Sequence, residues 1–237
     1  MRDFDVTIRI GLLTEGHDHL ILRAYLAKLL GVLDEEIEAD YPDGTGHGHG
    51  YVAATIDRAL RRFYNQCAQL AIISMDNDGN LDLLSSGGQE DPRHPRHWLH
   101  TNVDKPNGCR WCFIHDQVEQ TRPALNWIPT KPSLQWPVVI AVPVESIEAW
   151  LLTTQAILVT GTGSLHAEQE RRATYKMRLY RRPAATLEDV QTIALPMIRQ
   201  LEPDHLQTLR DHSRSFSDFA DQIKNCSDEL LTAPPCW

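Results

Sequence analysis

The sequence lacks several features that would assign it to a broad class of protein. No apolar run in its 237 residues is long enough to span a membrane. The first residues, MRDFDV, contain no apolar signal core, so we expect a cytoplasmic protein with no membrane partner. A Walker phosphate-binding loop is also missing, because the glycine-rich stretch GTGHGHG lacks the GKS ending. If ATP hydrolysis is needed, a partner must supply it.

Basic residues are in the minority. Lysine and arginine number 23 against 32 aspartates and glutamates, so the formal net charge is −9. This balance argues against non-specific binding of nucleic acid, although it leaves room for a local basic patch. Cysteines are also few, and the five of them lie far apart except for Cys109 and Cys112. We therefore expect reduced thiols, with one possible metal-binding pair.

Short apolar runs alternate with amphipathic stretches and predict an α/β fold. Strand-like runs occur at 5–13, 35–41, 69–75 and 137–143, and helical spacing occurs at 18–30, 51–66 and 145–158. Such alternation is typical of a Rossmann-like, mainly parallel sheet that helices cover on both faces. We expect 1–237 to form one domain. It would carry an irregular, Cys/His-rich insertion at about 80–136 and a helical C-terminal extension at about 186–237, broken at Pro196 and Pro203.

Carboxylates follow three of the predicted strands. Glu15 follows the first, Asp76 and Asp78 follow the third, and Glu145 and Glu148 follow the last. Ligands of parallel α/β sheets bind beyond the carboxyl ends of the strands, so these side chains are expected to converge. A carboxylate cluster repels itself unless a cation is present, and oxygen ligands suit Mg²⁺ or Mn²⁺. Taken singly, the same residues also fit a helix-start carboxylate and a polar turn.

The stretches LLTEGHDHLILRAYLAKLL and AIISMDNDGN together resemble the Toprim domain. Topoisomerases, primases and the overcoming-lysogenization-defect (OLD) nucleases share that domain. The stretches VPVESIEAWLL and HSRSFSDFADQI further resemble a Toprim-like group of bacterial proteins of unknown function, DUF4276. The resemblance covers about 5–31, 51–80 and 137–220. The chain departs from the family at His19, where an acidic residue is often found, and Asp18 lies one place earlier.

The resemblance implies a Mg²⁺-dependent nuclease that cleaves phosphodiester bonds of DNA or RNA. Glu15, Asp76 and Asp78 would form the main metal shell, and Glu145 or Glu148 could hold a second ion. Lys176 resembles the lysine that stabilises developing charge in OLD-type sites. Some Toprim nucleases act in phage defence beside an ATPase. The resemblance therefore implies a bacterial defence role and a possible ATPase partner.

A basic segment, RRATYKMRLYRRP, lies at 171–183. A substrate phosphodiester needs cations near an acidic site, and this segment could supply them at short range. Its tyrosines, Tyr175 and Tyr180, could stack on bases. A solvated helix face would have the same composition. The candidate nucleic-acid-binding residues are Arg171, Arg172, Arg178, Arg181 and Arg182.

A Cys-x-x-Cys pair in the insertion suggests a structural zinc site. Cys109 and Cys112 are followed by His115 at the same spacing, and His100 precedes them. These four residues would complete a tetrahedral Zn²⁺ site and could staple a segment that has no apolar periodicity. The neighbouring aromatic residues equally allow ordinary core cysteines.

Three functional hypotheses remain open on the sequence, and a phosphatase or nucleotidyl-transfer role also fits the carboxylates. The first is the Mg²⁺-dependent nuclease. The second is a non-catalytic Toprim-like subunit that binds a partner ATPase, which His19 favours. The third is a zinc-stapled nucleic-acid-binding module without chemistry. A homo-oligomer is compatible with each of them.

Overall fold

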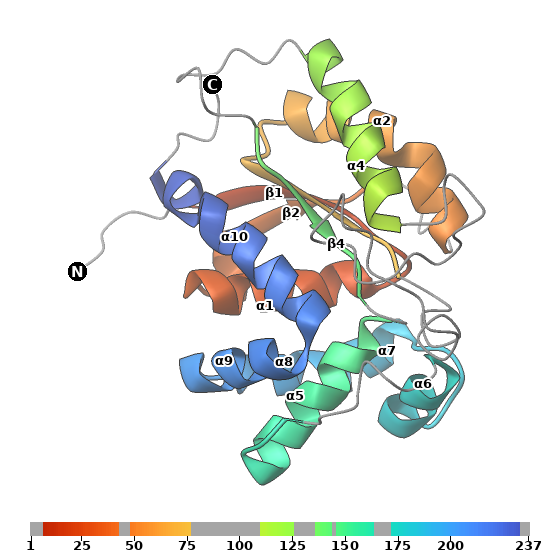
Figure 1. Ribbon diagram of the computed structural model, residues 1–237, viewed down its shortest axis with the longest axis vertical. Coiled ribbons are helices and arrows are strands. Elements are labelled where there is room, and N and C mark those ends of the chain that lie inside the picture. The colour runs from red at the N-terminus through yellow and green to blue at the C-terminus, as the bar shows by residue number, and fades with distance from the viewer. Residues whose placement is uncertain are drawn as a thin grey trace.

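A computed structural model describes residues 7–42, 48–76, 110–125, 136–143, 146–163 and 172–232. These ranges form an α/β fold (Figure 1). The strands are β1 (Ile8–Leu13), β2 (Ile37–Asp40), β3 (Leu70–Ser74) and β4 (Val138–Ala141). The longer helices are α1 (Asp18–Leu30), α2 (His49–Asn65), α4 (Arg110–Thr121), α5 (Glu148–Thr160), α6 (Arg172–Tyr180), α9 (Pro203–His212) and α10 (Arg214–Thr232). The short turns are η1 (Asp34–Glu36), η2 (Arg122–Leu125), α7 (Leu187–Asp189), η4 (Val190–Ala194) and α8 (Leu195–Arg199).

The four strands form one parallel sheet in the order β2-β1-β3-β4. Ile10 of β1 pairs with Ala39 of β2 on one side and with Leu70 of β3 on the other. On the far side of β3, Ile72 pairs with Val139 of β4. The prediction of a parallel sheet flanked by helices is therefore confirmed. β1 and β3 lie at the centre, and all three pairs of neighbouring strands are parallel.

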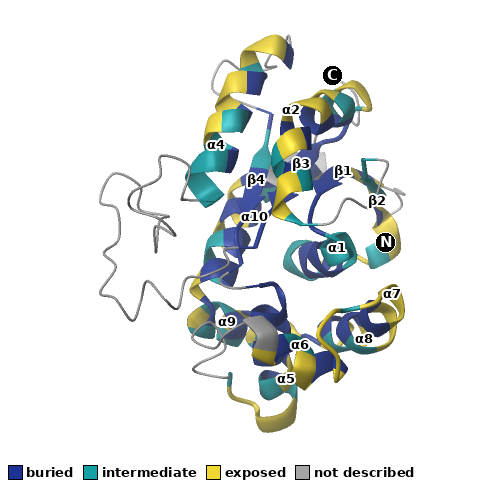
Figure 2. Cartoon of the chain, turned by 90° about the vertical axis from the view of Figure 1, so that its right-hand side faces the viewer, coloured by how far each residue is buried: buried dark blue, intermediate teal, exposed yellow. Residues whose placement is uncertain are grey.

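Side chains alternate between the two faces of the sheet, and each face has its own apolar core. Ile8, Ile10 and Leu12 pack with α1 and α10, whereas Leu13 packs with α2 and α4. All residues of β3 are buried, and so are those of β1 except Arg9, whereas Glu38 of β2 is exposed. Figure 2 shows the buried residues in dark blue. The burial of β3 on both faces explains why its sequence is a continuous apolar run rather than an alternating pattern.

Gly11, in the middle of β1, allows α2 to approach the sheet closely. A Cβ atom at this position would overlap with the aromatic ring of Phe63, which is fully buried on α2. The glycine therefore removes a side chain where the phenyl ring needs the space. It fixes the position of α2, whose N-terminus is beside the candidate site described below.

The helices from α5 to α9 form a layer against the outer side of α1, whereas α10 packs on β4. Helix α5 packs on α6 and α9, and α8 packs on α1, as Figure 1 shows at its lower end. The sequence predicted a helix break at Pro196, but the helical run continues from Leu187 to Arg199 through the π-helical turn η4. Pro196 has no N–H to donate to the carbonyl four residues earlier, and a widened turn accommodates this loss. None of the helices in the described ranges is long and apolar enough to cross a membrane.

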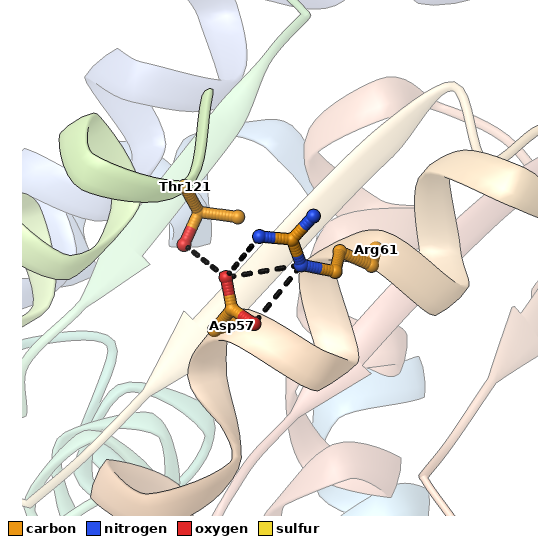
Figure 3. Close-up of polar contacts among 3 residues, drawn as sticks. All are labelled: Asp57, Arg61 and Thr121. Carbon is orange, nitrogen blue, oxygen red and sulfur yellow. Dashed lines mark hydrogen bonds and ion pairs between the residues drawn. The ribbon is translucent and has the colours of Figure 1, made fainter. Parts of the chain in front are cut away.

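Helix α4 corrects the prediction that 80–136 is irregular throughout. Its buried residues Ile114, Val118 and Thr121 follow helical spacing and pack toward the sheet. At its end, the Thr121 hydroxyl donates to Asp57 Oδ1 of α2 at 3.1 Å, and Arg61 donates to both carboxylate oxygens (Figure 3). This polar contact joins α4 to α2 on the same face of the sheet. The rest of the predicted insertion up to 109, and 126–135, lie outside the described residues.

Candidate functional site

The carboxyl ends of β1 and β3 bring two of the predicted acids together. Glu15 comes two residues after β1 and Asp76 comes two residues after β3, and both are buried. The backbone N–H of Asp76 donates to Glu15 Oε1 at 3.2 Å. Because the chain leaves β1 toward β2 but later enters β3 on the opposite side, a crevice is expected between these two strand ends. The acids thus lie at the usual ligand position of a doubly wound sheet.

A turn at Gly16 directs the chain from Glu15 into α1. Gly16 has a φ of +56°, a left-handed conformation that disfavours residues with a side chain. Asp18 is the first residue of α1 and faces the same cavity as Glu15. His19 lies apart from the cavity lining: its Nδ1 is 3.2 Å from the Gly16 carbonyl, and its ring is 4.3 Å from that of Tyr41. The acid of this turn is therefore Asp18, and His19 does not replace it at the site.

Glu148 supplies a third buried carboxylate. It is the first residue of α5 and is 2% exposed. Lys176, on α6, places its Nζ 3.5 Å from Glu148 Oε1. Glu148 Oε2 has no hydrogen-bond partner within the described part of the chain. Burying a carboxylate oxygen without a hydrogen-bond donor costs free energy. The position of Glu148 Oε2 therefore favours a bound cation or a further donor at this point.

These residues line one cavity of about 330 Å³. Its polar lining comes from the four carboxylates, His17 and Lys176, and its apolar wall comes from Ile21 and the segment around η4. The π-helical turn thus borders the cavity, as such turns often do at functional sites. The lining residues are Glu15, Gly16, His17, Asp18, Ile21, Gly48, Asp76, Glu148, Lys176, Ala184, Ala185 and Val190.

Three helix N-termini meet at this cavity. Asp18 begins α1, Gly48 is the residue before α2, and Glu148 begins α5. The positive ends of the helix dipoles lower the cost of gathering carboxylates there, each by about 0.3–1 kcal/mol. This contribution falls well short of the several kcal/mol that burying a charged group costs. The dipoles alone therefore do not explain why the acids gather here.

Tyr180 adds a phenol beside the acids. Burial, followed by the negative charges of Glu148 and Asp18, raises the pKa of the Tyr180 phenol well above its ordinary value. The group therefore stays protonated and can act as a donor. Its hydroxyl has no hydrogen-bond partner among the described residues. The sequence assigned Tyr175 and Tyr180 to base stacking, but both are buried, so that expectation is wrong.

The remaining members of the predicted acid set lie outside the described residues. Asp78 and Glu145 both fall in ranges that the structure does not describe. Within the ranges it does describe, no three His, Cys, Asp or Glu side chains are close enough to hold one metal ion. Glu15, Asp76 and Glu148 therefore share a cavity without forming a closed ligand set. Their oxygen-only chemistry fits Mg²⁺ or Mn²⁺.

The basic segment divides between the core and the surface. Lys176 lies in the cavity, whereas Arg178, Arg181 and Arg182 are exposed. Arg182 also lies near an acid, with its Nε 3.5 Å from Asp189 Oδ2. The exposed arginines precede Ala184 and Ala185 of the cavity wall by only a few residues. Arg171 and the side chain of Arg172 lie outside the described structure.

The predicted zinc ligands are only partly described. Cys112 and His115 lie one turn apart on α4. The His115 ring stacks on Trp111 at 4.8 Å, and its Nδ1 is 3.7 Å from Asp116 Oδ1. Cys109 and His100 lie outside the described residues, so the zinc site stays a prediction.

Some lining residues carried no sequence signal. Gly48, Ala184, Ala185 and Val190 are small or apolar, and only the fold brings them beside the acids. Pro196 was the available signal for the nearby η4 turn, because a proline inside a helical pattern disturbs the hydrogen-bond ladder.

Comparison with known proteins gives no homologue from which the site's chemistry could be transferred. The chain matches no known family profile, no curated protein and no solved structure.

Proposed function

We propose that this chain is a Mg²⁺- or Mn²⁺-dependent, Toprim-like nuclease that acts as a component of a bacterial anti-phage defence system. The observation that carries the proposal is the meeting of Glu15 and Asp76 at the carboxyl ends of β1 and β3, in a cavity that Glu148 and Lys176 also line. Glu15 and Asp76 belong to the two stretches that resemble the Toprim domain, TEG at 14–16 and DND at 76–78. The defence role rests on the sequence resemblance alone.

The donor atoms fit a hard divalent cation. Glu15, Asp76 and Glu148 offer only oxygen, and Glu148 Oε2 lacks a hydrogen-bond partner among the described residues. Asp78 and Glu145 follow Asp76 and precede Glu148 closely in sequence and would complete the ligand set. A bound Mg²⁺ would lower the pKa of a water molecule and stabilise the charge of a leaving oxygen.

The chain's own cations would receive the substrate. Lys176 lines the cavity, and its ammonium can donate to a phosphate oxygen. Arg178 and Arg181 are exposed nearby in the sequence and can contact the flanking phosphates. These residues would bind and position the substrate, and the carboxylates would hold the cation.

The test is a cleavage assay over a panel of single- and double-stranded DNA and RNA. Wild type is compared with Asp76→Asn in Mg²⁺, in Mn²⁺ and in a chelator. Asp204→Asn, an exposed acid at the start of α9, is the matched control. We expect cleavage by wild type and the control, and at least a hundredfold loss in Asp76→Asn. Equal cleavage by all three proteins would overturn the proposal.

A non-catalytic, partner-binding subunit is the second candidate. It is favoured by the finding that no three potential ligands come together within the described ranges. In this case the purified chain would bind neither Mg²⁺ nor Mn²⁺ and would cleave no member of the panel. It would instead form a stable complex with an ATPase. Calorimetric titration with Mn²⁺ separates the two candidates before any substrate is known.

A further inference from the structure

Glu148 and Lys176 form an ion pair inside the candidate cavity. Glu148 is almost fully buried, and the Lys176 side chain is 18% exposed. Among the described residues, Lys176 is the only cationic side chain paired with Glu148. The nearby Arg182 lies instead against Asp189. Lys176 is therefore the internal counter-ion of this carboxylate.

The geometry of this pair is loose. The Nζ–Oε1 distance of 3.5 Å exceeds the roughly 2.7–2.9 Å of a charge-assisted hydrogen bond. The second oxygen, Oε2, has no hydrogen-bond partner among the described residues. A single lysine therefore offsets the charge of Glu148 without satisfying both of its oxygens. A divalent cation offers more charge and can contact either oxygen.

We propose that Lys176 and the divalent cation compete for Glu148, so that metal binding releases the Lys176 ammonium into the cavity. The inference rests on the proposed function, because it requires the same cation site. In the metal-free state the Lys176 ammonium offsets the negative charge of Glu148. When the cation arrives, Glu148 turns to it, and the two positive charges repel each other.

The availability of the Lys176 ammonium therefore depends on whether the cation is bound. Lys176 remains within the cavity and becomes available to an anionic group, which the proposed reaction supplies as a substrate phosphate. An anion would thus find a free lysine only after the cation has bound. The expected result is ordered binding, with the cation first and the phosphodiester second. Helix α6, which carries Lys176, also carries the exposed Arg178.

Calorimetric titration with Mn²⁺ tests the competition without any nuclease assay. Wild type is compared with Lys176→Met and with Lys224→Met, which removes the same charge from an exposed position on α10. Because the methionine cannot compete for Glu148, we expect Lys176→Met to bind Mn²⁺ about tenfold more tightly than wild type. Lys224→Met should bind like wild type. Equal or weaker binding by Lys176→Met would overturn the inference.

A double-mutant cycle separates competition from a general effect of removing positive charge. In a Glu148→Gln background the neutral amide no longer holds the ammonium, so Lys176→Met should change the Mn²⁺ affinity less than twofold. If it still tightens binding tenfold, the lysine acts through its field rather than through Glu148, and the inference fails. If wild type and all variants bind no Mn²⁺, the proposed function fails as well.

Metal-free stability provides an independent readout. Lys176→Met leaves a buried carboxylate without its counter-ion, so its apparent melting temperature in chelator should fall by roughly 5 °C. Saturating Mn²⁺ should recover more of this loss than it adds to wild type. If Lys176→Met does not fold, Lys176→Gln keeps a donor for Glu148 and allows the same comparison. A melting temperature unchanged in chelator and equal gains with Mn²⁺ would contradict the competition.

Discussion

The backbone N–H of Asp76 donates to the side chain of Glu15 across 61 residues of sequence. This hydrogen bond joins the carboxyl ends of the two central strands and fixes one oxygen of the Glu15 carboxylate. The other oxygen, Oε2, faces Gly48 at the start of α2. Glu15 therefore has two separable roles: an acceptor that holds the strand ends together, and a charge that faces the cavity.

The two roles of Glu15 predict different outcomes for two substitutions. Glu15→Gln keeps an acceptor oxygen and removes the charge, so Mn²⁺ binding and cleavage should be lost while stability changes little. Glu15→Ala also leaves the buried N–H of Asp76 without its acceptor, which should lower the free energy of unfolding by about 1–3 kcal/mol. Urea unfolding, circular dichroism and Mn²⁺ titration measure the three properties. Equal stability of the two variants would contradict a structural role for the hydrogen bond.

The cluster of Asp57, Arg61 and Thr121 (Figure 3) predicts a small pH dependence of the free energy of unfolding. Hydrogen bonds from Arg61 hold the pKa of the Asp57 carboxyl below its ordinary value of 3.8, and the Thr121 hydroxyl contributes in the same direction. Because the folded-state pKa is lowered, the stabilisation is present above pH 3.8 and is lost as the pH falls through the lower, folded-state value. The side chain is 54% exposed, so solvent screens the pair and we expect about 0.5 kcal/mol.

Urea unfolding of wild type and Asp57→Asn between pH 3 and pH 7 checks this sign. Asp57→Asn should be the less stable protein at pH 7, and the difference should shrink toward zero in acid. Asp204→Asn, which changes an exposed acid outside this cluster, is the control. A difference that grows in acid would contradict the lowered pKa.

Much of the fold was predictable because the central elements are strongly patterned. The helix predicted at 18–30 begins and ends at Asp18 and Leu30, and all four predicted strands exist with shorter bounds. The short helix α4 was missed because Ile114 and Val118 are its main apolar signal, between segments rich in proline and glycine. Three inward residues in twelve give too little periodicity to distinguish a helix from a loop.

The sequence pointed to the acids of the candidate site and, through the resemblance, to Lys176. Glu15, Asp76 and Glu148 follow strands, and the rule for parallel sheets predicts that they meet. Only the tyrosines of α6 were interpreted incorrectly, because their place among arginines suggested that they were accessible for stacking on bases. The structure buries Tyr175 and Tyr180, whereas Lys176 lines the cavity as the resemblance implies. Which side of a short helix faces the core depends on the tertiary packing of α5 and α6, which local composition does not specify.

The zinc hypothesis predicts a metal that is separate from the divalent cation of the cavity. Purified protein should contain about one Zn²⁺ per chain by elemental analysis, and Cys109→Ser/Cys112→Ser should lose it. Cys226→Ser, which changes a buried cysteine of α10, is the control. Wild type without zinc would leave Cys112 as an ordinary residue of α4.

Gly11 predicts a steric effect on stability. Gly11→Ala places a methyl group into the Phe63 ring and should lower the free energy of unfolding by about 1–3 kcal/mol. Gly50, on α2, has open space around its Cα, so Gly50→Ala should instead stabilise the helix by about 0.5–1 kcal/mol. Thermal and urea unfolding compare the two variants. If Gly11→Ala and Gly50→Ala changed the free energy of unfolding equally, α2 would be able to move away from β1 and the steric prediction would be wrong.

Gln222 of α10 closes the outer edge of the sheet at β4. Its amide accepts from the Ile140 N–H at 3.0 Å and donates to the Ile140 carbonyl at 2.8 Å, as a neighbouring strand would. Gln222→Met keeps the volume but leaves both backbone groups without these partners, so the free energy of unfolding should fall by about 2–3 kcal/mol. The exposed edge should also promote pairing between the β4 strands of two protein molecules.

Gln207→Met, at an exposed position on α9, is the control for Gln222→Met. Amide hydrogen exchange at Ile140 and light scattering measure the two effects. If exchange at Ile140 stays as slow in Gln222→Met as in wild type, the edge is protected by packing alone and the prediction is wrong.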